Sequence, residues 1–168
     1  MVRLADSPTV EVNVHVAAPP ERVWALVSDI TTPAGLGGEL YEVEWLDGAP
    51  GPALGATFVG RNRNDRLGSW ETVSRIFDYR PEHAFGWEVR ALQGGFDRPV
   101  ARWRFDLEAE NGGTRLRQSV TLGQGGSYLS TAIKAQPEQE EQIIARRMGM
   151  LEQGIRSTLD SIRERAEA

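Results

Sequence analysis

The sequence predicts an α+β domain in which one antiparallel sheet packs against one long C-terminal helix. Three observations lead to this prediction. Between residues 9 and 122, short segments alternate apolar with polar residues, as half-buried strands do. Turns rich in glycine, proline and asparagine separate these segments. From residue 137 to residue 168, apolar residues recur every three or four positions, the period of an amphipathic helix. We expect one domain, residues 1–168, with its core in residues 9–165.

Composition restricts the class of protein. The chain has 168 residues, 24 acidic and 19 basic, and its net charge of −5 argues against a broad nucleic-acid footprint. It has no cysteine, which excludes disulfides, thiol nucleophiles and thiolate metal sites. No apolar run approaches the ~18 residues of a membrane span, and residues 1–8 do not resemble a secretion signal. We expect a cytoplasmic protein, monomeric or homodimeric, with no nucleic-acid partner and no membrane insertion.

The first two elements are a strand and a short helix. Residues 9–17 predict a half-buried strand, because every second residue is a valine, at positions 10, 12, 14 and 16. Pro20 followed by Glu21 is typical of the first turn of a helix, and apolar residues continue to position 30. Residues 30–39 predict a mobile loop or a broken helical turn, because glycines occupy positions 35, 37 and 38.

The middle of the chain predicts a run of strands joined by turns, at residues 40–46, 54–62, 69–79, 83–92, 100–110 and 114–122. In the segment 69–79, the apolar phase set by Trp70 conflicts with the phase of Phe77 and Tyr79. A β-bulge reconciles the two phases, because one extra residue shifts the alternation. Residues 128–135 connect the last strand to the long helix, either irregularly or as a helical turn.

The long C-terminal helix carries one apolar stripe, formed by Ile144, Met148, Leu151, Ile155, Leu159 and Ile162. Charged residues occupy the positions between them, which suits a helix with one solvated side. Arg147 and Gly149 interrupt the pattern near the beginning of the helix. We therefore expect its second half to be sealed core, and Ile144, Arg147 and Met148 to face a bound molecule.

Aromatic residues on the predicted strands are candidates for a binding site. Each tryptophan brings a large apolar surface and one hydrogen-bond donor. The five tryptophans either fill the core between sheet and helix or line a pocket. In the pocket interpretation, a planar or lipid-like ligand binds in a pocket lined by Phe58, Trp70, Phe85, Trp87 and Trp103.

Three polar residues share the apolar faces of their strands, namely Asn62, Thr72 and Gln118. A buried amide without a partner costs several kcal/mol by transfer estimates, so each must bond to backbone, water or ligand. Gln118 is the sharpest candidate because it lies in the middle of its strand. These three residues complete the expected ligand-binding set.

No catalytic or metal-binding set is recognisable. His15 falls on the polar face of its strand, and neither histidine has a second ligand at helical spacing. Gly-x-Ser-x-Gly is absent, and the glycines at 123–126 are not followed by the Lys-Ser or Lys-Thr of a phosphate loop. We expect no metal and no cofactor. Arg61, Arg63 and Arg66 form a basic hairpin, interpreted as a solvated tip.

Three stretches carry a resemblance to a known family: APPERVWALVSD at 18–29, GATFVGRNR at 55–63 and GTRL at 113–116. Together with the element order, they resemble the START-like superfamily, and within it the bacterial polyketide cyclase/dehydrase-like branch, also called SRPBCC proteins. The resemblance implies a helix-grip fold, with a curved seven-stranded antiparallel sheet around the long helix. It also implies two short helices after the first strand and a hydrophobic cavity between sheet and helix.

The glycine-rich segment departs from the family pattern. Many relatives carry a tryptophan where this chain has PAGLGG at 33–38, which predicts a looser gate to the cavity. The leading functional hypothesis is therefore binding of a hydrophobic or aromatic, lipid- or polyketide-like molecule. The alternative is a cyclase or aromatase that uses the same cavity, with Arg147 added to the three polar residues. A third hypothesis is a partner-binding module with a filled core.

Overall fold

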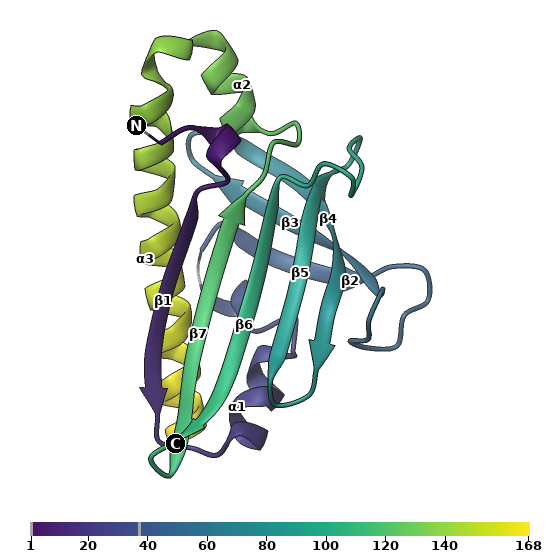
Figure 1. The fold of residues 1–168 in the computed structure, drawn as a ribbon. Coiled ribbons are helices and arrows are strands. Elements are labelled where there is room, and N and C mark those ends of the chain that lie inside the picture. Colours follow the sequence, from purple (N-terminus) through teal and green to yellow (C-terminus); the bar gives the residue numbers. More distant parts are fainter. Residues whose placement is uncertain (1, 37) are drawn as a thin grey trace.

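The computed structural model describes residues 2–36 and 38–168 and shows one seven-stranded antiparallel sheet in the order β1-β7-β6-β5-β4-β3-β2. The strands are β1 (Thr9–Val16), β2 (Leu40–Trp45), β3 (Thr57–Asn64), β4 (Gly68–Arg80), β5 (Ala84–Ala91), β6 (Ala101–Glu110) and β7 (Gly113–Leu122). The first strand lies beside the last (Figure 1). The predicted α+β helix-grip fold is confirmed.

The helices of the described chain are α1 (Pro20–Val27), α2 (Tyr128–Ala135), α3 (Glu140–Glu167) and the 3-10 helix η2 (Pro33–Leu36). Two further 3-10 turns, η1 (Leu4–Asp6) and η3 (Pro137–Gln139), precede β1 and α3. Figure 1 shows α3 running beside β1 and β7, with α1 at one end of the sheet and α2 at the other. Within the described part of the chain, every helix is too short or too polar to cross a bilayer.

The long helix is fastened to both ends of β1. The carboxylate of Glu140 accepts a hydrogen bond from the backbone nitrogen of Leu4 at 3.0 Å, just before β1. At the other end, Glu167 accepts one from the backbone nitrogen of Ala17 at 3.1 Å. In the expected stripe, Ile144 is buried and Met148 is half-buried, and none of Leu151, Ile155, Leu159 and Ile162 is more than 8% exposed. The prediction of a sealed second half is confirmed.

One open alternative is decided and one predicted boundary is corrected. The segment 128–135 is a regular helix, because the Ser127 hydroxyl caps it by accepting a hydrogen bond from the backbone nitrogen of Ser130 at 3.2 Å. The long helix begins at Glu140, because residues 137–139 form a 3-10 turn. The glycine-rich segment contains the helix η2, and its Gly37 lies outside the described residues.

The predicted bulge in β4 is confirmed. Ile76 lies opposite Trp87 and Asp78 lies opposite Gly86, so Phe77 has no cross-strand partner. The extra residue returns Tyr79 to the face of the core and leaves Phe77 on the other face. A similar irregularity in β2 leaves Tyr41 unpaired between neighbours that pair with β3.

The two faces of the sheet differ in chemistry. The face toward α3 is apolar and aromatic. Successive side chains of a strand point to opposite faces, and the opposite face carries arginines and carboxylates. There, Glu88 is 4% exposed by side chain and pairs with both Arg75 and Arg102. The outer face is thus occupied by ion pairs, and the face toward α3 is the one suited to an apolar ligand.

Candidate ligand-binding site

An aromatic cluster lies at the centre of the face toward α3. The ring of Phe85, which is 2% exposed, lies 5.6 Å from Trp87, 6.1 Å from Trp24 and 6.2 Å from Tyr79. Trp87 also stacks on Trp103, with centroids 6.2 Å apart and planes within 5°. These residues come from α1 and from three strands, because alternate residues of each strand point to one face.

A small cavity lies against this cluster. Its volume is about 40 Å³, and it is lined by Val27, Asp29, Ile30, Pro33, Leu40, Phe58, Phe85, Trp87 and Phe105. Sites for drug-sized ligands occupy about 300–1,000 Å³. The container expected between sheet and helix is therefore almost closed in this conformation. Of the aromatic side chains that were predicted to line it, Phe58, Phe85 and Trp87 form part of its wall.

Gln118 lies inside this apolar region with an unsatisfied oxygen. It is 3% exposed, and its cross-strand neighbours are Val12 on β1 and Phe105 on β6, both buried. Among residues 2–36 and 38–168, its Oε1 atom finds no hydrogen-bond partner. Phe105 also lines the small cavity. The polar group is thus one residue away from the cavity, and its carbonyl oxygen accepts nothing.

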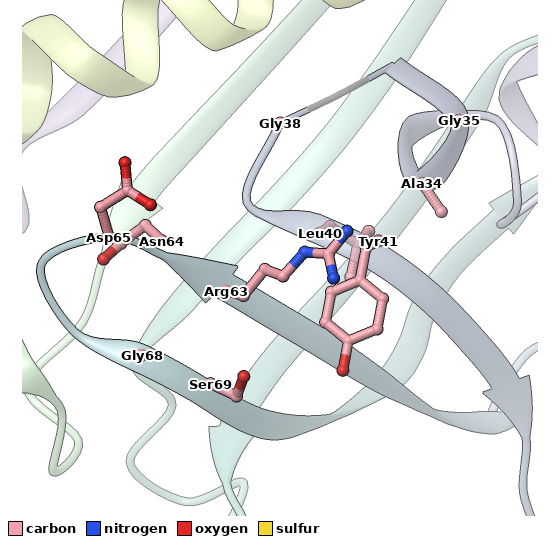
Figure 2. A pocket seen from close by; sticks show the side chains of 10 residues that line it. All are labelled: Ala34, Gly35, Gly38, Leu40, Tyr41, Arg63, Asn64, Asp65, Gly68 and Ser69. Carbon is pink, nitrogen blue, oxygen red and sulfur yellow. The ribbon is translucent and has the colours of Figure 1, made fainter.

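A larger hollow opens on the surface beside the cavity. It measures about 640 Å³ and lies between residues 33–36 and 38–39, which we call the gate segment, the start of β2 and the β3–β4 hairpin (Figure 2). It is lined by Ala34, Gly35, Gly38, Leu40, Tyr41, Arg63, Asn64, Asp65, Gly68 and Ser69. We call it the outer hollow. Leu40 lines both the outer hollow and the inner cavity. The side chain of Leu40 therefore contacts both the surface hollow and the aromatic interior.

Leu40 rests on a glycine. A methyl group at Gly60 would lie 3.1 Å from Leu40 Cδ1 and 3.3 Å from Thr72 Oγ1. The absence of a side chain at Gly60 thus makes room for Leu40 beside Thr72. This contact explains why β3 carries a glycine in phase with Phe58 and Asn62, and it sets the position of Leu40.

The gate segment is tied to α3 through charge. Arg147 donates to Glu39 at 3.2 Å, and the two side chains are 31% and 28% exposed. Asn64 on β3 donates to the same carboxylate at 2.8 Å. Arg147 was expected to face a bound molecule; in this conformation its guanidinium is engaged by Glu39 instead. The carboxylate connects the gate to both the helix and the hairpin.

The remaining predicted residues are spread around this region. Phe58, Phe85 and Trp87 are brought together at the inner cavity. Ile144 is buried and Met148 packs against the core from α3. Trp70 lies apart, at the end nearer α2, where its ring is 5.8 Å from Tyr128. The half-buried Asn62 donates a long hydrogen bond of 3.4 Å to the carbonyl of Gly60 on its own strand, and Thr72 lies beside Leu40.

Sequence reasoning missed Leu40, Phe105 and Glu39. Phe105 carried a usable signal, because it shares its strand face with Trp103. Leu40 is the first apolar residue after the glycine-rich gate, which was a weaker signal. No signal in the sequence pointed to Glu39, because its partner Arg147 is 108 positions away.

Two carboxyl groups on the outer face have lowered pKa values. Hydrogen bonding by Arg80, assisted by Arg104, lowers the pKa of Asp78 below its usual range. Arg115, with His15, lowers the pKa of the Glu110 carboxyl. Both shifts arise in ion pairs that stabilise the sheet, so they do not mark an acid or base for catalysis. In the described residues no group of three histidines or carboxylates is arranged to hold a metal.

Comparison with known proteins assigns the family. Residues 7–167 match the family described as polyketide cyclase/dehydrase and lipid transport. The chain belongs to this family. It thereby falls in the polyketide cyclase branch of the START-like superfamily, as the sequence motifs indicated. Membership supports a hydrophobic ligand-binding or cyclase role. No curated protein sequence matches the chain.

Solved structures of this fold include several similar proteins. A polyketide-cyclase-like protein from Corynebacterium glutamicum is 29% identical over 96% of this chain and 90% of its own, with a TM-score of 0.63. The Zhui aromatase/cyclase from a Streptomyces species is 15% identical over 95% and 93%, with a TM-score of 0.67. The di-domain ARO/CYC protein BexL is 18% identical, with a TM-score of 0.70. The match with BexL covers 98% of this chain and 53% of BexL.

Proposed function

We propose that the protein binds a small hydrophobic or aromatic molecule between the sheet and α3. The observation that carries this proposal is Gln118, whose buried Oε1 accepts no hydrogen bond from the described part of the chain and lies in an aromatic interior. Leaving such a group unsatisfied costs about 1–3 kcal/mol. A core selected for stability alone would carry an apolar residue there. A ligand that donates one hydrogen bond to this oxygen removes the cost.

The chemistry of the site defines the ligand class. Aromatic rings from Phe85, Trp87 and Trp103 favour a planar ring system. Gln118 Oε1 is an acceptor and requires a donor such as a phenolic or enolic hydroxyl. The expected ligand is therefore an aromatic or polyketide-like molecule with at least one hydroxyl group. Asn62 and Thr72, near Leu40, supply further polar contacts on the way in.

Binding requires the interior to widen. The inner cavity of about 40 Å³ holds little more than a water molecule. We expect the ligand to enter from the outer hollow, displace Leu40 and separate α3 and the gate from the aromatic cluster near Phe105. Met148 and Arg147 then border the enlarged space. The tie between Glu39 and Arg147 opposes this opening, so ligand binding and loss of that ion pair are coupled.

Fluorescence titration tests the proposal with a matched ligand pair. 2-Naphthol has the hydroxyl donor, and 2-methoxynaphthalene keeps its shape without it. We expect 2-naphthol to quench tryptophan fluorescence and to bind up to about tenfold more tightly, the value of one net hydrogen bond. Gln118→Met should abolish the preference. Gln153→Met, on the exposed side of α3, is the control and should preserve it.

Native mass spectrometry of protein purified from its own host gives an independent result. A co-purified small molecule of the expected class supports the proposal. Failure of both naphthalenes to bind, together with no co-purified molecule, would overturn it. An unchanged preference in the Gln118→Met variant would reject the assigned role of Gln118.

The cyclase alternative rests on the family description and on the polar residues that approach the cavity. Asp29 is the one carboxylate that lines the inner cavity, but it already accepts hydrogen bonds from the backbone nitrogen and hydroxyl of Thr31 at 2.9 and 2.6 Å. Both hydrogen bonds end on Oδ1, so Asp29 serves as the acceptor of a turn, and we assign it no catalytic role. We therefore rank binding above catalysis. Turnover of a polyketide chain that is lost with Gln118→Met would reverse this ranking.

The partner-binding alternative is ranked third. Large apolar side chains exposed in the described residues are scattered along the chain, at Val2, Tyr41, Leu54, Leu92, Tyr128 and Met150. A docking surface needs such residues in one contiguous patch. The net charge of −5 and the ion-paired outer face support a freely diffusing protein without a nucleic-acid partner. We propose one domain that acts as a monomer or homodimer in the cytoplasm.

A further inference from the structure

The outer hollow contains an arginine unlike the others of the sheet. Seven strand arginines form ion pairs, at positions 61, 75, 80, 102, 104, 115 and 117. Arg90 donates instead to the carbonyls of Ala91 and Leu92, at 3.1 and 2.9 Å. The guanidinium of Arg63 forms neither an ion pair nor a hydrogen bond with any residue that the structure describes, namely 2–36 and 38–168. Its donors are therefore available to a bound molecule.

Arg63 is nevertheless held in place. Its guanidinium lies over the ring of Tyr41, 4.6 Å from the centroid. Tyr41 reaches this position because it is the unpaired residue of the irregularity in β2. Stacking on an aromatic ring fixes the plane of a guanidinium and leaves its edge, with the forked donors, exposed. That edge matches the two oxygens of a carboxylate.

The surroundings of Arg63 favour one negative charge. In Figure 2, Arg63 extends across the outer hollow toward Tyr41, whereas the carboxylate of Asp65 points away from it. The hollow is lined by a single cation and a single acid. A dianion would meet only one cation and would be repelled by Asp65, so the balance suits a monoanion. Tyr41 and Ser69 place hydroxyl donors on the same walls.

We propose that the outer hollow is a carboxylate-binding site, in which Arg63 binds the carboxylate of an amphipathic ligand. The apolar part of that ligand extends past Leu40, which the outer hollow and the inner cavity share. This inference rests on the proposed function for the apolar part alone. It assigns a role to the basic hairpin that the sequence had suggested to be only a solvated tip.

The test uses benzoate, which is small enough to occupy the outer hollow without entering the interior. Titration into ¹⁵N-labelled protein should shift the Nε–H signal of Arg63 and the backbone amides of Tyr41 and Ser69. Arg63→Gln should weaken binding at least about fivefold, because a charge-assisted bidentate contact is lost. Arg66→Gln is the matched control on the same hairpin, outside the lining, and should leave benzoate affinity within a factor of two.

The arms of the experiment separate the possible results. Phenyl phosphate, a dianion of similar size, should bind more weakly than benzoate; tighter binding would overturn the carboxylate assignment. Absence of benzoate shifts at the outer hollow, or equal effects of the two arginine substitutions, would overturn the site itself. The preference of the protein for 2-naphthol over 2-methoxynaphthalene, which depends on Gln118, is measured separately. Failure of the outer site and failure of the proposed function are therefore distinguishable.

Discussion

The Glu39 carboxylate and the Arg147 guanidinium pair at 3.2 Å across 108 positions of sequence. This contact fastens the end of the gate segment to α3. Both side chains remain about a third exposed, so we expect a modest contribution of about 0.5–1 kcal/mol, reduced at high salt. Glu39→Gln should raise hydrogen exchange of the amides at residues 38–41 and lower the free energy of unfolding by that amount.

Glu152→Gln provides the comparison for this prediction. It removes an exposed pair with Arg156 one turn away on α3. Its effect on stability should lie within a few tenths of a kcal/mol, and gate exchange should not change. Equal exchange rates in the two variants would show that the ion pair does not hold the gate.

Gln118→Met should make the protein more stable while weakening ligand binding. The substitution keeps the length of the side chain and removes an unsatisfied buried oxygen. We expect the free energy of unfolding to rise by about 1–2 kcal/mol. Urea denaturation of the ligand-free protein measures the change. A loss of stability would show that Oε1 is satisfied in solution by a bound water.

Leu40→Ala should open a passage between the outer hollow and the inner cavity. Because Leu40 is shared by both spaces, its truncation removes the barrier that an incoming ring must displace. We expect the association rate of 2-naphthol, followed by stopped-flow fluorescence, to rise several-fold. Leu54→Ala, at a site 70% exposed and outside both linings, should leave the rate unchanged. Unchanged association in the Leu40 variant would place the route elsewhere.

Gly86→Ala should destabilise the sheet at its bulge. An added methyl group would lie 2.9 Å from Phe77 Cζ, so the aromatic ring must move. We expect a cost of about 1–3 kcal/mol in thermal or urea unfolding. Combining it with Phe77→Leu should recover part of the loss. A methyl group at Gly149, on the exposed side of α3, would meet no atom within 4 Å. Gly149→Ala should therefore stabilise the protein by about 0.5–1 kcal/mol.

Acidification should weaken the outer face of the sheet through Asp78. Arg80 and Arg104 lower the pKa of this carboxyl in the folded protein, so the folded state binds its proton less readily than the unfolded chain. The stability that Asp78 contributes is complete above the unfolded pKa of about 3.9 and is lost as pH falls through the lower folded pKa. Asp78→Asn should flatten this part of the stability profile, whereas an unaltered acid limb would refute the assignment.

The alternation of β1 and the stripe of α3 predicted a sheet packed against one helix, because each records which face an element buries; the seven-stranded helix-grip fold followed from the family resemblance. The same reasoning located the bulge, since Trp70 and Tyr79 could not otherwise share a face. It left residues 128–135 open between an irregular connector and a helical turn, because α2 buries none of its eight residues and is capped by Ser127. Short helices of this kind carry little periodic signal.

The site was predictable only in part. Strand phase identified Phe58, Phe85 and Trp87 at the cavity and Gln118 beside it. The size of the cavity depends on how those rings pack together, and periodicity contains no information on packing. Leu40 and the Glu39 tie to Arg147 were missed because they join segments that are distant in the chain and depend on side-chain conformation.

The pairing of β1 with β7 has a consequence for synthesis of the protein. Thr9 lies opposite Thr121, and the helix that covers β1 begins at Glu140. During translation β1 therefore waits without its partner strand until β7 has left the ribosome. Such long-range closure slows folding, because the entropy of ordering the intervening chain is lost before the contact forms. We expect the valines of β1 to be a binding site for nascent-chain chaperones, and the fold to be completed after the last residues are made.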